Sequence, residues 1–62
     1  MKNEKISELM GLGLSKKAAH EAWLHDVDVS LGENGLIYLT VASKAYDGMT
    51  IDEANAKLEN WN

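Results

Sequence analysis

Apolar and polar residues recur along this chain with several spacings, and one segment near its middle decides which fold the pattern favours. Within 36–47 the strongly polar residues stand at positions i, i+3, i+4 and i+7, namely Thr40, Ser43, Lys44 and Asp47. On a helix this spacing gathers them into one stripe and leaves the rest of the surface apolar. We therefore predict that 36–46 belongs to a central helix that needs neighbours on several sides. This helix starts either near Leu31, with Ser30 and Glu33 as a capping box, or after Asn34.

A strand is the alternative for the same segment. Asn34-Gly35 is a good hairpin turn, and it is followed by residues that favour a sheet, namely Ile37, Tyr38, Thr40 and Val41. Period-two alternation breaks at 36–37 and at 41–42, however, which favours the helix. The predicted fold class is all-α, a compact bundle of three to four short helices; the alternative is an α+β fold with a hairpin at about 27–41.

Two helices are predicted before the central segment. The first is capped by Asn3 and ends at the glycines of 11–13, and its apolar face consists of Ile6, Leu9 and Met10. Ser15 is a good N-cap for the second, whose core-facing stripe consists of Ala18, Ala19, Ala22 and Trp23. Residues 25–30 lack a helical period and are predicted to be a connector.

The last helix has the clearest amphipathic pattern. Asp47-Gly48 is predicted to end the central helix, and Thr50 with Glu53 forms a capping box that starts the last one. Its apolar face consists of Ile51, Ala54, Leu58 and Trp61. We expect this helix to reach about residue 60 and Trp61 to pack against the central helix.

Length and composition predict a single small helical domain, residues 1–62, near the lower size limit for independent folding. The chain has no cysteine, so neither a disulfide nor a thiolate metal site is expected to stabilise it. No signal peptide is visible, and no apolar run approaches the ~20 residues that a membrane span needs. We therefore expect a cytoplasmic protein without a membrane partner.

The charge balance argues against a nucleic-acid partner. Ten acidic residues against six basic ones give a net charge of −4, and all six basic residues are lysines. Arginine supplies the bidentate contacts to guanine and phosphate, so its absence weakens such a function.

Two short motifs resemble metal sites, but neither has the required spacing. His20-Glu21 is followed by His25 one residue later than the H-E-x-x-H pattern of zinc proteases requires, which turns the two imidazoles away from each other on a helix. Residues 26–30 resemble the start of a calcium loop, yet Leu31 and Ile37 stand where glycine and glutamate are needed. No serine lies in a Gly-x-Ser-x-Gly turn. We predict no enzyme activity, no metal and no cofactor.

Two segments resemble parts of known families. Residues 9–12 (Leu-Met-Gly-Leu), followed by Ser15 and an alanine-rich helix, are similar to the start of ubiquitin-associated domains, where a Met-Gly-Phe/Tyr loop meets ubiquitin; here Leu12 replaces the aromatic residue. Residues 46–54 resemble the helix, Gly-Met-Thr turn and Glu-Ala helix of helix-turn-helix regulators, which implies a nucleic-acid-associated regulator.

The function predicted from these observations is that of a small acidic protein-binding module. It would act by protein–protein contact as a regulator or inhibitor, of the kind that phages and other mobile elements encode; the alternative is the helix-turn-helix-like regulator. The predicted contact residues are apolar positions expected to stay uncovered, namely Leu24, Ile37, Tyr38 and Val41. Their cover is another protein or a second copy of the chain in a homodimer.

Overall fold

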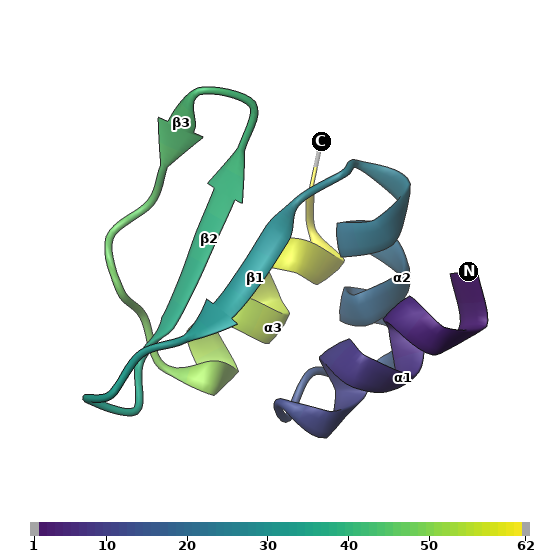
Figure 1. Cartoon of the computed structure of the whole chain (residues 1–62), viewed down its shortest axis with the longest axis horizontal. Coiled ribbons are helices and arrows are strands. Elements are labelled where there is room, and N and C mark those ends of the chain that lie inside the picture. Colours follow the sequence, from purple (N-terminus) through teal and green to yellow (C-terminus); the bar gives the residue numbers. More distant parts are fainter. Residues whose placement is uncertain (1, 62) are drawn as a thin grey trace.

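Helices and one antiparallel sheet make up the part of the chain that the computed structural model describes, residues 2–61 (Figure 1). The elements are, in order, α1 (Lys2–Gly11), α2 (Lys16–Leu24), β1 (Asp28–Leu31), β2 (Ile37–Val41), β3 (Lys44–Ala45) and α3 (Ile51–Glu59). The fold is therefore α+β, and the predicted all-α bundle is wrong. The alternative hairpin at about 27–41 corresponds to the observed pair of β1 and β2.

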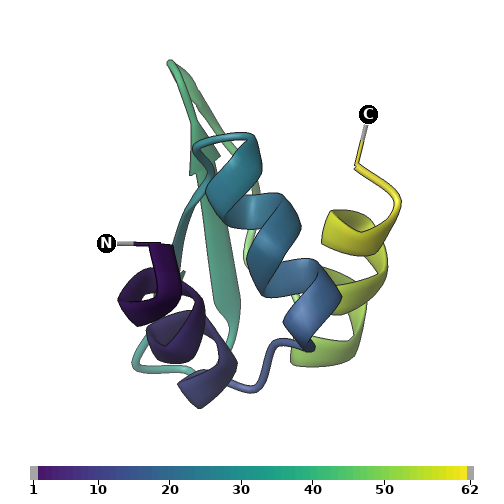
Figure 2. The same cartoon turned by 90° about the vertical axis from the view of Figure 1, so that its right-hand side faces the viewer.

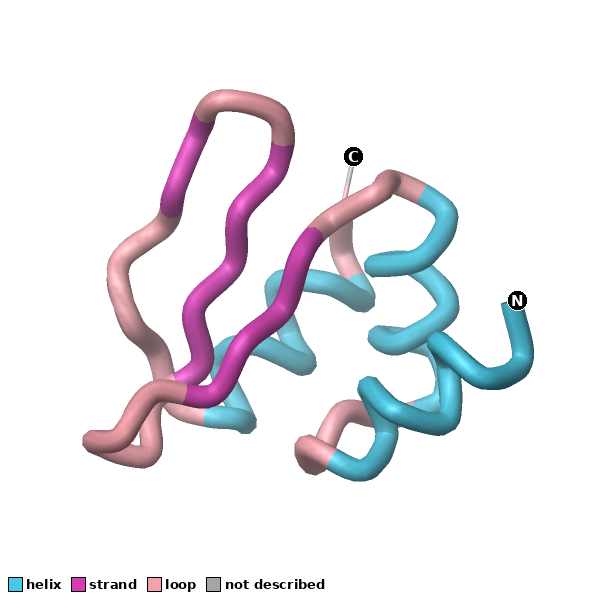
Figure 3. Tube along the Cα trace, viewed as in Figure 1, coloured by secondary structure: helices cyan, strands magenta, loops and turns pink. Residues whose placement is uncertain are grey.

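The sheet has the order β1-β2-β3, and the helices lie on one side of it. Figure 3 shows strands and helices as separate layers, and in Figure 2 the helices lie in front of the sheet. Strand β2 alternates accordingly: Ile37 and Leu39 are buried on the helix side, whereas Thr40 is exposed on the other. The sheet thus has a covered inner face and an uncovered outer face.

The breaks in alternation that favoured a central helix are the two ends of β2. Leu36 still belongs to the loop after β1, and Ala42 begins the turn to β3. The loop consists of residues 32–36, in which Gly35 N–H donates to Gly32 C=O at 3.0 Å and Gly35 has a φ of 83°. Asn34 adds an Asx turn, since its Oδ1 accepts from Leu36 N–H at 3.0 Å. The predicted central helix over 36–46 is therefore replaced by the strand β2, a turn and the short strand β3.

The chain after β3 continues along β2 with one extra residue. Tyr46 N–H donates to Leu39 C=O at 2.8 Å, whereas Met49 pairs with Ile37 through bonds of 2.7 and 2.9 Å. These two pairings differ in register by one residue, which marks a β-bulge between 46 and 49. The predicted helix end at Asp47-Gly48 is wrong, and Gly48 instead lies against the ring of Tyr38.

Most helix termini follow the local signals in the sequence, but the predicted N-cap Asn3 is wrong, because α1 begins at Lys2 and Asn3 lies inside it. Ser15 caps α2 by accepting from Ala18 N–H at 3.1 Å, and Thr50 and Glu53 form the predicted capping box of α3. The end of α1 is a Schellman motif: Gly13 has a φ of 110°, and Leu14 N–H donates back to Leu9 C=O at 3.4 Å. These caps confirm the predicted starts of α2 and α3.

The core lies between the inner face of the sheet and the three helices. Its buried members are Leu9, Leu14, Ala18, Ala19, Ala22, Val27, Ile37, Leu39, Ala54 and Leu58. Trp23, predicted to be in the core, is instead 39% exposed at the surface of α2, and Met10 is exposed on α1. The three alanines of α2 are fully buried, so this short helix has close neighbours along its buried side.

Candidate binding cleft at the end of the last helix

The first wall of the cleft is Tyr46, which follows β3 on the inner face of the sheet. Ala45 pairs with the exposed Thr40, so its neighbours Lys44 and Tyr46 point to the opposite, helix side. The backbone bond between Tyr46 N–H and Leu39 C=O holds this position. The ring of Tyr46 is thereby directed towards the end of α3.

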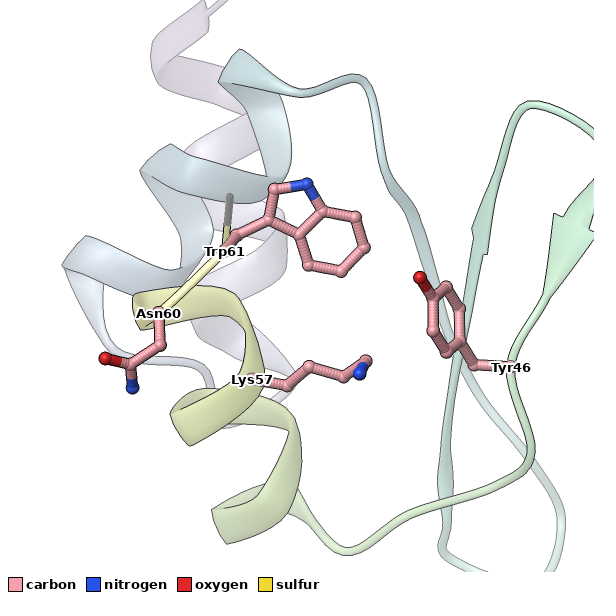
Figure 4. Close-up of a pocket in the computed structure, with 4 residues that line it drawn as sticks. All are labelled: Tyr46, Lys57, Asn60 and Trp61. Atoms are coloured by element: carbon pink, nitrogen blue, oxygen red, sulfur yellow. The ribbon is translucent and has the colours of Figure 1, made fainter.

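The second wall is Trp61, just after α3. The helix ends with Asn60 as its C-cap, and Trp61 N–H donates to Leu58 C=O at 3.2 Å, which turns the indole towards the sheet. The ring centroids of Trp61 and Tyr46 are 5.9 Å apart at an interplanar angle of 64°, an edge-to-face arrangement. Figure 4 shows the two rings turned towards each other, with the side chain of Lys57 extending below them towards Tyr46.

Two lysines from different elements converge on the ring of Tyr46. The Nζ of Lys57, on α3, lies 4.6 Å from the ring centroid, and the Nζ of Lys44, on β3, lies 4.7 Å from it. Both distances are typical of cation–π contacts. The ring of Tyr46 therefore has two ammonium groups close to it, one from β3 and one from α3.

The cleft between these elements has a volume of about 370 Å³ and is lined by Tyr46, Lys57, Asn60 and Trp61. This volume lies near the lower end of the range for ligand pockets, roughly 300–1,000 Å³. None of the four lining residues carries a carboxylate. The cleft combines two aromatic walls, an ammonium group and an amide, a set suited to holding an amphipathic group with a negative end.

The two histidines occupy separate places. His25, the C-cap of α2, extends the aromatic group, because its ring centroid lies 6.3 Å from that of Trp61. Its Nε2 is 4.0 Å from the carboxylate of Glu21, the pair expected from their i, i+4 spacing. His20 instead contacts Trp23 on α2, with ring centroids 6.0 Å apart. Among residues 2–61, no three His, Cys, Asp or Glu side chains are grouped so as to hold a metal ion.

The predicted contact residues do not form one surface. Leu24 is 56% exposed at the end of α2, but Ile37 is 1% exposed and belongs to the core. Tyr38 lies on the outer face of the sheet, where its hydroxyl accepts from Asn34 Nδ2 at 3.0 Å. Val41 is partly buried on the inner face and pairs with Lys44. The patch of Ile37, Tyr38 and Val41 depended on the helix, because only a helix would place these positions side by side.

Sequence reasoning missed the cleft because its residues come from distant parts of the chain. Trp61 was expected in the core and is partly buried there, but its ring contacts Tyr46 and His25 rather than a central helix. The predicted central helix would place Tyr46 on its apolar surface. Lys44 and Lys57 carried no local signal, since an isolated lysine usually marks a solvated surface.

The structure shows what the two segments that resemble known families form in this chain. The segment 46–54 does not contain two helices, because Tyr46 continues the pairing with β2 and only α3 follows. Leu12, in the loop that resembles ubiquitin-associated domains, packs against the core.

Comparisons of the chain with protein families, with curated proteins and with solved structures found no match. None of the helices within residues 2–61 is long and apolar enough for a membrane crossing.

Proposed function

We propose that this chain is a small acidic protein-binding module that acts by contact with another protein through the cleft of Tyr46, Lys57, Asn60 and Trp61. The observation that carries the proposal is the pair of partly buried aromatic rings facing each other across an open cleft. Tyrosine and tryptophan are the residue types most often found as energetic anchors of interfaces, especially where a pocket surrounds them. A module of this kind serves as a regulator or inhibitor in the cytoplasm, and phages and other mobile elements commonly encode such proteins.

The remaining exposed apolar residues support the choice of the cleft. Met10, Trp23, Leu24 and Leu31 are the large apolar side chains exposed among the described residues, and they come from three different elements, α1, α2 and β1. Single exposed apolar residues are common on soluble proteins and need no partner. The cleft differs because it joins a concave shape to aromatic walls. Leu24 remains as a contact residue only at the margin, one position before His25.

The nucleic-acid alternative has weaker support. The segment before Thr50 is a strand and a bulge, so the geometry of a helix-turn-helix is missing there. The chain also carries a net charge of −4, which repels a polyanion. A catalytic role has no support from the cleft either, because its lining offers no nucleophile paired with a general base.

Site-specific photo-crosslinking tests the proposal. Benzoylphenylalanine in place of Asn60 puts the reactive group in the cleft, and the same residue in place of Ser30 puts it on the uncovered outer face of the sheet. We expect the Asn60 variant to crosslink a discrete protein in extract of the native host, and excess unmodified chain to abolish the product. The Ser30 variant is the matched control.

Two outcomes decide against or refine the proposal. Equal crosslinking from both positions, or none from Asn60, would contradict contact through the cleft. A product of twice the chain mass formed by the purified protein would identify a second copy of the chain as the partner, and the module would then be a homodimer.

A further inference from the structure

We infer that the cleft recognises an acidic peptide segment of the partner, in which an apolar side chain is flanked by carboxylates. This inference rests on the proposed protein-binding function and adds the chemistry of the segment that enters the cleft. It follows from the charge of the cleft, from its two aromatic walls and from its size.

The local charge of the cleft is opposite to that of the whole chain. The chain has a net charge of −4, yet Lys44 and Lys57 both bring their ammonium groups to the ring of Tyr46, and Lys57 also lines the cleft. Within residues 2–61 neither lysine forms an ion pair, and the one pair found joins His25 and Glu21. A ring face contacts only one side of each ammonium group, so a carboxylate can bind on the other side.

The acidic residue of α3 that is closest to Lys57 in the sequence, Glu59, is bonded to a residue outside the cleft. Glu59 accepts a hydrogen bond from the hydroxyl of Ser15 at 2.5 Å, on the side of α3 that contacts α2. It is therefore engaged with the start of α2 and does not line the cleft. The ammonium groups beside Tyr46 can therefore bind the carboxylates of a ligand. Such opposite charges are the complementarity expected between an acidic segment and its binding site.

The walls of the cleft require an apolar group beside the carboxylates. Tyr46 and Trp61 present partly buried rings, and their edge-to-face contact leaves ring surface along the cleft. A volume of about 370 Å³ suits one or two side chains rather than a folded element. An aliphatic or aromatic side chain can pack against the open ring surface of Tyr46 and Trp61 while its acidic neighbours reach Lys57 and Lys44.

Single-stranded nucleic acid is the competing ligand, because aromatic walls with nearby lysines also bind stacked bases. Its affinity comes mainly from phosphate contacts, which need several cations along the strand. The structure brings two lysines to the ring of Tyr46, of which Lys57 lines the cleft, in a chain that carries ten acidic residues. A short peptide with a few carboxylates fits this small number of cations better than a polyanion.

A titration followed by ¹⁵N–¹H correlation spectra tests the inference on the full chain. The probe is the peptide acetyl-Glu-Asp-Leu-Glu-Asp-amide, and its control is the twin acetyl-Gln-Asn-Leu-Gln-Asn-amide, which has the same shape without the charges. We expect the acidic peptide to shift the Trp61 indole signal and the backbone signals of Lys57 and Asn60 in a saturable way. The indole signal of Trp23, on α2, is the internal control and should stay in place.

Charge-reversal variants connect the binding to the lysines. The double variant Lys44→Glu/Lys57→Glu should bind the acidic peptide about tenfold more weakly, because two exposed ion pairs are lost and two repulsions replace them. Lys17→Glu makes the same kind of change in the first turn of α2, at the other end of that helix from His25. This control should change affinity by less than about twofold. Unchanged dispersion of the spectra shows that both variants remain folded.

Several outcomes would overturn the inference. They are the absence of a Trp61 shift, equal binding of the uncharged twin, or equal binding by the double lysine variant. Octathymidylate that shifts the same signals at a lower concentration than the acidic peptide would also overturn it and assign the cleft to nucleic acid. Crosslinking from Asn60 that persists in the double lysine variant separates the two proposals, since protein binding would then stand and the acidic segment would not.

Discussion

Among residues 2–61, two non-glycine residues have left-handed backbone conformations, Asp26 with a φ of 56° and Ala42 with a φ of 52°. Asp26 follows the C-cap of α2 and completes a Schellman motif, in which Val27 N–H donates to Ala22 C=O at 2.8 Å. Aspartate tolerates this region because its side chain can bond locally. Ala42, in the two-residue turn between β2 and β3, has no such compensation, so the hairpin forms at the cost of local strain.

Replacing Ala42 with glycine should stabilise the protein. A left-handed conformation costs an ordinary L-residue roughly 1–2 kcal/mol and costs glycine almost nothing, which outweighs the extra flexibility of the unfolded chain. We expect Ala42→Gly to raise the free energy of unfolding by about 0.5–1 kcal/mol in urea titrations followed by circular dichroism. Ala45→Gly, in β3 with an ordinary negative φ, is the control and should lower it. A loss of stability in Ala42→Gly would show that the turn is unstrained.

Tyr38 on the outer face depends on the glycines that its ring covers. A Cβ added at Gly48 would lie 2.8 Å from Tyr38 Cζ, and one at Gly32 would lie 2.6 Å from Tyr38 Cε1. We expect Gly48→Ala to lower the free energy of unfolding by about 1–3 kcal/mol, because the ring must leave its position. The loss of unfolding free energy caused by Gly48→Ala should be smaller when Tyr38 is also replaced by alanine. A double-mutant cycle measures this interaction between the two positions.

The matched control for this prediction is Gly11→Ala at the end of α1. An added Cβ there meets no atom within 4 Å, and alanine favours the helix. Its free energy of unfolding should stay the same or rise. If Gly48→Ala costs the same with and without the Tyr38 ring, the close approach is not the cause.

At the scale of elements, α3 is joined to the start of α2 by side-chain bonds rather than by apolar packing alone. Asn55 Oδ1 accepts from Ser15 N–H at 2.8 Å, and Asn55 Nδ2 donates to Gly13 C=O at 3.3 Å. Ser15 both caps α2 and donates to Glu59, so one residue orders a helix start and binds a second helix. The orientation of α3, and therefore the position of Lys57 and Trp61, depends on this group of bonds.

Asn55→Ala should lower the free energy of unfolding by about 1–3 kcal/mol, since it leaves the partly buried Ser15 N–H without its acceptor. Urea unfolding measured by circular dichroism gives this value. Asn60→Ala at the C-cap of α3 is the control, because the side chain of Asn60 donates only to the carbonyl of Ala56 in α3 itself. Equal losses in the two variants would mean that Asn55 does not connect α3 to the rest of the fold.

At the scale of the whole molecule, Trp61 holds three parts of the chain together. Its ring contacts Tyr46 after β3 and His25 at the end of α2, and it packs against the core from the end of α3. In a chain of this size without disulfides, stability is small, and a contact shared by three elements is a substantial part of it.

Trp61→Ala should therefore lower the free energy of unfolding by about 1–3 kcal/mol, less than for a fully buried tryptophan because Trp61 is only partly buried. The change should appear as a lower urea midpoint. Leu24→Ala, at a side chain that is 56% exposed, is the control and should cost less than about 0.5 kcal/mol. An unchanged midpoint in Trp61→Ala would show that the tryptophan adds no stability and only borders the cleft.

The sequence by itself determined the features that depend on neighbouring residues. The starts of α2 and α3 follow from Ser15 and Thr50, because a capping side chain bonds the backbone three residues further along. The left-handed glycine at 13 likewise ends α1 through bonds within its own turn. The hairpin turn at 34–35 was also visible locally, but it could not outweigh the helical spacing of the next residues.

Tertiary structure decided what the middle of the chain and the cleft became. The segment 36–46 is too short for its sequence to distinguish the helical spacing of polar residues from the alternation of a strand. The strand is selected by the burial of Ile37 and Leu39 against the helices and by the pairing of β2 with a strand on each side. The cleft needs Tyr46 and Trp61 from separate elements, and no pattern within either element indicates the other. Local chemistry therefore determined the helix ends, whereas the sheet and the site arose from contacts between distant residues, which local patterns do not encode.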